Sequence, residues 1–158
     1  MQCDKCGKGI YRERTDKLIC SEPFIGDITV YNVTYSVCDN CKAFLLPIET
    51  CSILDKERDK IFTDWLLHQP IHQFLSLKQT AEILNVTPQF LSRNKKIKSG
   101  LIFQAKKGKY TYYLKKSVKQ YKKTGDGRFN LPKEELLFLQ QREQEQKKQE
   151  HGFDIVLD

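Results

Sequence analysis

The most regular alternation of hydrophobic and polar residues in this chain predicts a short helix after residue 75. Leu77, Ala81 and Leu84 recur at helical spacing and therefore share one face of that helix. Ser76 is placed to cap the helix, and Gln79 three positions later completes a capping box. The small alanine in the middle of the apolar face allows a second helix to approach closely.

A second set of helix-start signals follows directly. Asn85 interrupts the first helix, Thr87 is a favourable N-cap, and Pro88 stands at the first helical position. Val86, just before the cap, can pack against Leu91 as a hydrophobic staple. Two helices joined by so short a turn form a helix-turn-helix, whose second helix enters the major groove of DNA.

A predicted β-hairpin follows the helix pair. Leu101–Ala105 and Tyr110–Leu114 have the composition of strands, and the basic segment Lys106–Lys109 between them contains a glycine. A short amphipathic helix is predicted over Lys115–Lys123. A helix-turn-helix followed by such a hairpin is a winged helix-turn-helix, and we assign it to residues 75–124.

Short strand-like segments separated by turn residues fill the N-terminal part of the chain. Turns are predicted at Gly26 and Asn32. A helix is predicted from about residue 53 to residue 68, because apolar residues recur at helical spacing and Pro70 ends the run. We expect Trp65 on this helix to pack against the strands. The predicted strands are Ile10–Arg14, Leu18–Ser21, Ile28–Tyr31 and Val33–Val37.

The C-terminal residues 128–158 carry two apolar groups on a polar background. Leu136–Leu139 form one apolar turn of a predicted helix, and Phe153–Leu157 form an apolar tail. Between them Gln140–Glu150 is almost entirely polar, so it cannot bury a face of its own. Such apolar groups are typical of contact surfaces, and the partner is the protein's own body, a second copy in a homodimer, or another protein. We expect deletion of this arm to leave both domains folded.

Four of the six cysteines form two Cys-x-x-Cys pairs. Four thiolates complete a closed tetrahedral zinc site, and a segment with so small a core needs a metal to stay folded. Neither pair lies in the βαβ pattern of a redox motif. We therefore predict a zinc-ribbon domain over residues 1–68 with one structural zinc ion per chain, held by Cys3, Cys6, Cys38 and Cys41. Cys20 and Cys51 are expected to be small buried hydrophobic residues, and the histidines to lie on the surface.

Charge is distributed unevenly along the chain. Residues 76–127 carry 13 Lys and Arg against 2 Asp and Glu, a net charge of +11, whereas residues 1–75 and residues 128–158 carry −2 each. The basic excess therefore lies in the segment that contains the predicted helix-turn-helix. A surface that binds DNA phosphates requires this concentration of positive charge, whereas a pair of core helices with a solvated face does not.

Candidate DNA contacts follow from the predicted elements. Gln89, Ser92 and Arg93 lie on the exposed face of the second helix and are expected to read base edges. Five lysines after this helix and on the hairpin are expected to contact phosphates of a double-stranded DNA operator. These lysines are Lys95, Lys96, Lys106, Lys107 and Lys109.

The N-terminal part of the chain resembles a known family of zinc-binding domains. The run Ile28–Cys41 ends in a Val-Cys-x-x-Cys knuckle, and the chain begins with Met-x-Cys-x-x-Cys. Together they are similar to the N-terminal domain of MqsA-type antitoxins, the YgiT-type zinc finger. That family usually has Gly-Glu after the second pair, where this chain has Lys42–Ala43. The resemblance covers roughly residues 1–68 and implies a structural zinc and a toxin-binding module.

A second resemblance lies in the basic segment. The string Leu-Ser-Leu-Lys-Gln-Thr-Ala-Glu-Ile-Leu-Asn-Val-Thr, then a basic hairpin and a helix, resembles excisionase-type, MerR-like winged helix domains over about 50 residues. The segment Asn94–Gly100 is more basic and less apolar than in most members. In MqsA-type antitoxins the DNA-binding half is a different helix-turn-helix, so this chain would join the same two tasks with another DNA reader.

The sequence therefore predicts an α+β protein with three parts. An N-terminal four-cysteine zinc ribbon precedes a MerR/excisionase-like winged helix-turn-helix and a C-terminal helical arm. The resemblances imply a transcriptional regulator that acts as a type II antitoxin, binding its cognate toxin and repressing its own operon. The alternative is an excisionase-like DNA-binding regulator of a phage or mobile element, with no toxin partner.

Other classes of protein are disfavoured by the sequence. It shows no Ser/His/Asp or Cys/His constellation and no phosphate loop, and four thiolates leave zinc no open position, so we do not expect an enzyme. No apolar run approaches the ~20 residues of a membrane span, and the N-terminus does not resemble a signal peptide. We expect a cytoplasmic, nucleoid-associated protein whose cysteines bind metal and do not form disulfides.

Overall fold

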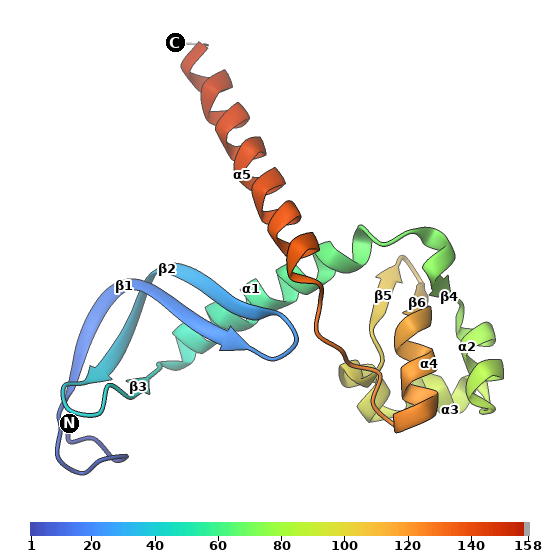
Figure 1. The fold of residues 1–158 in the computed structure, drawn as a ribbon, viewed down its shortest axis with the longest axis horizontal. Helices are drawn as coiled ribbons and strands as arrows, with labels where there is room; N and C mark the ends of the chain where they lie inside the picture. Colours follow the sequence, from blue (N-terminus) through green and yellow to red (C-terminus); the bar gives the residue numbers. More distant parts are fainter. Residues whose placement is uncertain (157–158) are drawn as a thin grey trace. The chain divides into compact units, whose positions relative to one another are not determined.

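The computed structural model describes the backbone of residues 1–156 (Figure 1) and the side chains of residues 1–149. Leu157 and Asp158 lie outside the described residues, as do the side chains of the predicted apolar tail Phe153–Leu157. The chain is a mixed α+β structure that divides into two compact units, residues 1–61 and residues 62 onward. Each unit contains one three-stranded antiparallel sheet.

The sheet of the first unit is built from two long strands and one very short one. Strands β1 (Tyr11–Glu22), β2 (Gly26–Cys38) and β3 (Phe44–Leu45) lie in the order β1-β2-β3. The four short strands predicted from the sequence are thus two continuous ones. The predicted turn at Asn32 is a bulge inside β2, where the pairing with β1 shifts and Asn32 adopts a φ of 54°.

The bulge decides which side chains of β2 face the core. Ile28 and Val30 are buried before it, and Val33 and Tyr35 are buried after it. Strict alternation from Ile28 would have turned both later residues outward, because side chains alternate with a period of two. The extra residue at the bulge resets the alternation, so that both halves of the strand bury the same face.

Helix α1 (Ile48–Leu67) begins five residues before its predicted start, and the boundary between the two units falls inside it. Its first turns are joined to the hairpin of the first unit. The Thr50 hydroxyl donates to the Thr34 carbonyl, and Leu54 is buried. Arg58 lies 3.8 Å from Glu22 as an ion pair.

The second unit consists of short elements around a small sheet. Its sheet has the order β4-β6-β5, and the two-residue strand β4, which the sequence did not predict, pairs with β6. The elements are a 3-10 turn η1 (Ile71–Gln73), β4 (Phe74–Leu75), α2 (Leu77–Leu84), α3 (Pro88–Arg93), a helical turn η2 (Ile97–Leu101), β5 (Gln104–Lys107), β6 (Tyr110–Leu114), α4 (Lys115–Thr124) and α5 (Lys133–Val156).

The predicted caps of α2 and α3 are confirmed. The Ser76 hydroxyl accepts the amide of Gln79 at 3.2 Å, and the Gln79 side chain accepts the amide of Ser76 at 3.0 Å. Asn85 ends α2 with a left-handed φ of 61°. The Thr87 hydroxyl then accepts the amide of Phe90 at 3.1 Å and starts α3. These bonds satisfy amide groups that the first helical turn leaves without partners.

The segment after α3 differs from the predicted strand over residues 101–105. The Asn94 side chain accepts the amides of Lys96 and Ile97 at 3.0 and 3.1 Å, which starts a new helical turn. That turn is distorted at Gly100, whose φ of 114° is readily adopted only by glycine. Strand β5 therefore begins at residue 104, and its hairpin with β6 closes through a two-residue turn with Gly108 in the first position.

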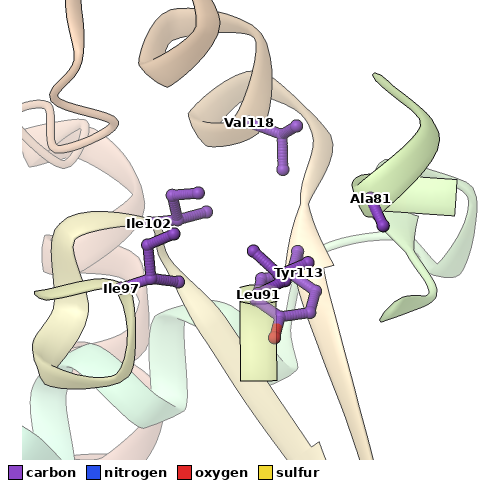
Figure 2. Close-up of a cluster of buried hydrophobic side chains, with 6 residues drawn as sticks. All are labelled: Ala81, Leu91, Ile97, Ile102, Tyr113 and Val118. Carbon is purple, nitrogen blue, oxygen red and sulfur yellow. The ribbon is translucent and has the colours of Figure 1, made fainter. Parts of the chain in front are cut away.

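The hydrophobic core of the second unit joins its helices to its sheet. Figure 2 shows six buried side chains that come together from α2, α3, η2, β6 and α4 and from the residue after η2, namely Ala81, Leu91, Ile97, Ile102, Tyr113 and Val118. Val86 packs against this cluster, which includes its predicted staple partner Leu91. The pair of helices and the hairpin therefore form one packed body.

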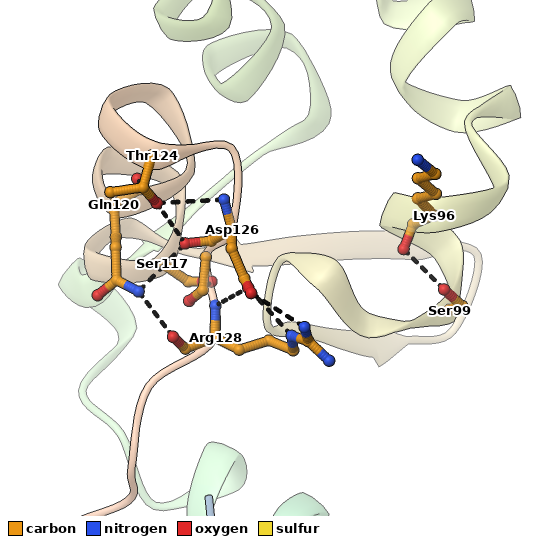
Figure 3. A network of polar contacts seen from close by, with 8 residues as sticks. Lys96, Ser99, Ser117, Gln120, Thr124, Asp126 and Arg128 are labelled. Atoms are coloured by element: carbon orange, nitrogen blue, oxygen red, sulfur yellow. Dashed lines mark hydrogen bonds and ion pairs between the residues drawn. The ribbon is translucent and has the colours of Figure 1, made fainter.

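A polar network holds residues 126–128, which follow α4 and which we call the strap, against this body (Figure 3). The fully buried Ser117 hydroxyl donates to the Gly127 carbonyl and accepts the Phe103 amide, both at 2.8 Å. The Gly127 amide donates to the Leu101 carbonyl at 2.9 Å. A Cβ atom on Gly127 would lie 2.6 Å from the Ser117 carbonyl oxygen, so only glycine fits in this strap.

The strap leads into an aromatic cluster. The Phe129 ring lies 4.8 Å from that of Phe103 and 6.1 Å from that of Trp65, measured between ring centroids. The Trp65 indole donates to Glu135 at 2.6 Å, and Leu136 is buried. These partners of Trp65 all lie in the second unit, whereas the sequence predicts packing against the N-terminal strands.

Residues 129–136 consequently belong to the folded body and not to a detachable arm. Leu131 is buried as well, whereas Leu137 and Phe138 on α5 are more than half exposed. From residue 140 to residue 149 the side chains of α5 are exposed, except for half-buried Glu143. Among the described residues, no helix combines the length and hydrophobicity needed to cross a bilayer.

Candidate functional site

Four cysteines from two loops meet at one end of the first unit. All four sulfur atoms lie within 4.8 Å of one another. The Sγ atoms of Cys3 and Cys41 are 3.7 Å apart, as are those of Cys6 and Cys38. A disulfide would bring two sulfurs to about 2.0 Å, so all four thiols are free. The cysteines predicted as ligands are therefore brought together.

The two loops share one backbone design. In the first, the Gly7 amide donates to the Cys3 carbonyl at 2.9 Å, and Gly7 has a left-handed φ of 66°. In the second, the Lys42 amide donates to the Cys38 carbonyl at 3.2 Å, and Lys42 has a φ of 63°. Each loop therefore turns at the residue after its second cysteine. Glycine adopts this conformation without strain, but lysine does not.

Close packing between the loops depends on Gly9. A Cβ atom at this position would lie 2.3 Å from the Cys38 sulfur, closer than any real contact. The amide of Ile10 donates to the Asp39 carboxylate at 2.9 Å, and the Asp39 amide donates back to the Ile10 carbonyl at 3.1 Å. Reciprocal bonds thus fix one loop against the other.

Backbone amides point at two of the sulfur atoms. Cys6 accepts the Gly9 amide at 3.4 Å, and Cys38 accepts the amides of Asn40 and Cys41 at 3.4 Å. The Gly9 amide, with that of Lys8, lowers the pKa of Cys6 to about 6. Donors of this kind stabilise a thiolate, which is the form that binds metal.

The other thiols respond to their neighbours. The Tyr11 hydroxyl lowers the pKa of Cys3. For Cys41 the Ala43 amide acts to lower the pKa, but burial and the three nearby sulfurs outweigh it and raise the pKa to about 11. Four thiols so close together cannot all ionise without a cation, because each negative charge opposes the next.

The geometry fits a tetrahedral metal ion. A zinc ion with bonds of about 2.3 Å to four sulfurs requires sulfur–sulfur separations of about 3.8 Å. The two separations of 3.7 Å agree with that value. Four thiolates would fill the coordination sphere, so the ion would link the two loops and offer no position to a substrate.

The remaining cysteines take no part in this cluster. Cys20 is half-buried, and burial raises the pKa of its thiol. Cys51 is exposed, so the prediction that it is a buried hydrophobic residue is wrong. His68 and His72 are exposed, as predicted, and the side chain of His151 lies outside the described residues.

A groove of about 950 Å³ runs along the second unit. It lies between α2, α3 and the β5–β6 hairpin. Three of the predicted DNA contacts line it, namely Ser92, Lys106 and Lys109. Lys78 and Lys98, which the sequence did not single out, line it as well, together with Tyr110 and Tyr112 among others. Lysines from a helix, a helical turn and a hairpin therefore share one concave surface.

The other predicted contacts are exposed but do not line this groove. Gln89 and Arg93 lie on the surface of α3, and Lys95 and Lys96 follow it. Lys107 lies at an adjoining, mainly apolar pocket of about 500 Å³. Among the described side chains, no carboxylate forms an ion pair with any of these lysines or with those of the groove.

Comparisons with known proteins do not assign this chain to a family. A scan against protein-family models found no match, and searches of curated proteins and of solved structures found no significant match. What the chain does must therefore be argued from its own residues.

Proposed function

We propose that this protein is a DNA-binding transcriptional regulator that acts as a type II antitoxin. Its second unit would bind a double-stranded operator as a winged helix-turn-helix, with α3 in the major groove and the β5–β6 hairpin as the wing. The observation that carries the proposal is the groove between these elements, which lysines line without any ion-paired carboxylate among the described side chains.

Uncompensated lysines around a concave surface favour a polyanion. A surface that neutralises phosphates gains free energy by releasing counterions, and lysines already paired with carboxylates could not provide it. Helix α3 is exposed along Gln89, Ser92 and Arg93, which leaves polar side chains free to meet base edges. The caps at Ser76 and Thr87 fix where α2 and α3 begin.

The four cysteines are proposed to hold one structural zinc ion. Soft thiolate ligands in a tetrahedral set favour zinc over magnesium or calcium, which prefer oxygen. The ion would supply only a cross-link between the loops that precede β1 and follow β2.

The antitoxin role rests on the resemblance of the ribbon and on apolar side chains that the first unit leaves in solvent. Phe44 and Leu45 form the edge strand β3, which pairs with β2 on one side only, and both are exposed. Ile48, at the start of α1, is 84% exposed. An exposed sheet edge with apolar side chains can accept a strand from a partner.

DNA binding can be tested on promoter DNA from the protein's own operon. If Arg93 grips a guanine, Arg93→Ala should cost about 1–3 kcal/mol of binding free energy and relax sequence preference. Lys107→Ala should weaken binding to all sequences alike and reduce the salt slope by about one unit. Competition assays with operator and random duplexes separate the two effects. Loss of affinity in both variants without any change in preference would contradict this division of roles.

Toxin binding needs a separate experiment. The tagged protein is recovered from its native host, and co-purified proteins are identified by mass spectrometry. We expect a small toxin that is retained by wild type and lost from a Phe44→Asp, Leu45→Asp variant with an intact metal site. A regulator that binds operator DNA but retains no toxin would instead favour the excisionase-like alternative.

A further inference from the structure

We propose that helix α4 carries a second site for nucleic-acid phosphates, separate from the groove between α3 and the hairpin. This inference rests on the proposed DNA binding and extends it to a surface that the sequence did not assign. A concave region of about 560 Å³ lies against α4. It is lined by Gln73, Lys115, Lys116, Lys119, Gln120, Lys123 and Thr124, none of which lines the groove.

The charge of α4 is unusually one-sided. Its ten residues contain five lysines and no acidic residue. The helix buries Ser117 and Val118, whereas four of its lysines are exposed and Lys115 is half-buried. Among the described side chains, none of these lysines forms an ion pair, and Asp126 just beyond the helix is already bound to Arg128 at 2.9 Å. The positive charge is therefore available to an external partner.

The positions of these lysines do not help the helix itself. Lys115, Lys119 and Lys123 stand four residues apart, and like charges at that spacing destabilise a helix. Lys115 and Lys116 also occupy the first turn, where the helix dipole favours acidic side chains. Only Lys122 and Lys123, in the last turn, match the dipole. A partner that neutralises the row would remove this repulsion.

The length of the row indicates a polymer and not a single phosphate. From Lys115 to Lys123 the helix rises by about 12 Å, at about 1.5 Å per residue. One strand of duplex DNA carries a phosphate about every 3.4 Å along its axis, so the row can face roughly three or four of them. The Lys116 ammonium lies 4.4 Å from the centre of the Phe129 ring, which limits its freedom before any partner binds.

Three variants, each lacking four lysine charges, test this site in the full-length protein. The α4 variant replaces Lys115, Lys116, Lys119 and Lys123 with Gln, and the groove variant replaces Lys78, Lys98, Lys106 and Lys109 with Gln. A control variant replaces four exposed lysines elsewhere, Lys17, Lys56, Lys133 and Lys148, with Gln. Glutamine keeps the helical preference of lysine, and circular dichroism checks that each variant is folded.

Binding to a random-sequence duplex of about three helical turns is measured by fluorescence anisotropy between about 50 and 200 mM salt. We expect the α4 variant to lose on the order of tenfold in affinity and up to about 3.6 units of salt slope, at about 0.9 per phosphate, relative to the control. A second assay asks whether an immobilised duplex captures a free labelled duplex through the protein. If wild type captures the free duplex and the α4 variant does not, the α4 lysines bind phosphates of a second duplex. If the α4 variant has a reduced salt slope but wild type captures no second duplex, the α4 lysines bind phosphates of the same duplex that lies in the groove.

The outcomes separate this inference from the proposed function. If the α4 variant matches the control in both assays while the groove variant loses binding, the α4 site is refuted and the proposed DNA binding stands. If the groove variant matches the control while the α4 variant loses binding, the α4 site stands and the groove is not the DNA surface. If the α4 variant still captures the second duplex and the groove variant does not, two copies of the chain bridge the duplexes through their grooves. The α4 site would then be refuted.

Discussion

The two units of this protein reach a fixed structure by different means. In the first, the loops that hold the four cysteines bury little more than Cys3, Tyr11 and Cys38, and the sulfurs themselves form much of that cluster. In the second, six buried side chains from helices and sheet pack together, and a polar strap adds an aromatic cluster. The cysteine loops of the first unit would therefore depend on a bound metal ion, whereas its long hairpin and the second unit depend on buried side chains spread along the chain.

This difference determines where each unit is vulnerable. A metal cluster concentrates free energy in four atoms, so a single substitution can remove it. A packed core distributes its stabilising free energy over many contacts, so each single substitution removes only part of it. Each unit also contains a glycine at which an added methyl group would clash with neighbouring atoms. These are Gly9 between the cysteine loops and Gly127 in the strap, and together they allow a matched test.

The largest effect is expected from Cys38→Ser. Structural zinc in small domains provides about 10–16 kcal/mol, so loss of one thiolate should release the metal and unfold residues 1–50. The second unit should stay folded, because its core contains no cysteine. Metal analysis and hydrogen exchange by segment measure both effects, with Cys51→Ser as the control outside the cluster. Purified wild type without bound zinc, yet with a protected ribbon, would contradict the expectation.

Truncation at the C-terminus should give the next largest effect. The loss of stability should depend on where the chain is cut. Deleting residues 128–158 removes the buried side chains of Leu131 and Leu136 and the half-buried side chain of Phe129. It should cost on the order of 5 kcal/mol, at roughly 1.5–3 kcal/mol for a fully buried side chain and less for Phe129. The sequence predicts that both domains stay folded without this arm, and the packing of Leu131 and Leu136 now adds a cost in stability to that expectation. Deleting residues 140–158 removes described side chains that are all exposed except half-buried Glu143, and it should change stability little. Thermal unfolding of the two truncations compares them, and equal melting temperatures would show that the strap does not stabilise the unit.

The matched pair Gly9→Ala and Gly127→Ala should act on different units. Each new methyl group meets atoms closer than 3 Å, and overpacking of this kind typically costs about 1–3 kcal/mol. Gly9→Ala should weaken metal retention against a chelator while leaving the second unit unchanged. Gly127→Ala should lower the melting temperature of the second unit while leaving metal retention unchanged. If both variants lose metal equally, the two units are not independent in stability.

The smallest effect is expected at Lys42, and it should be favourable. Residue 42 has a left-handed backbone with φ 63°, which costs a residue with a Cβ about 1–2 kcal/mol, and Lys42→Gly removes this cost. Part of the gain is offset because glycine loses more conformational entropy on folding. We expect a net gain of about 1 kcal/mol in the first unit. Gly7→Ala, at the equivalent position of the other loop, should destabilise by a similar amount. Chelator titrations of both variants give the comparison, and a loss of stability in Lys42→Gly would show that its side chain, which reaches the Asp39 carbonyl at 3.4 Å, matters more than its backbone.

Features that depend on neighbouring residues were readable from the sequence. The capping box at Ser76, the cap at Thr87 and the glycine of the hairpin turn each involve bonds across a few residues. The cysteine pairs were equally readable, because ligand spacing in each loop is local and four thiolates need one shared position. Sequence reasoning therefore located the four-cysteine cluster and both helices of the pair.

Features that depend on distant residues were decided only by the tertiary structure. The bulge at Asn32, which sets the buried face of β2, follows from pairing with β1, and composition alone suggested a turn there. Trp65 could have packed on either side of α1, and its partners Phe129 and Glu135 lie more than 60 residues away in sequence. Local hydrogen bonds and ligand spacings are determined by residues close together in sequence. Which apolar surfaces and lysines come together depends instead on closing long loops and filling one core. No short stretch of sequence specifies these long-range contacts.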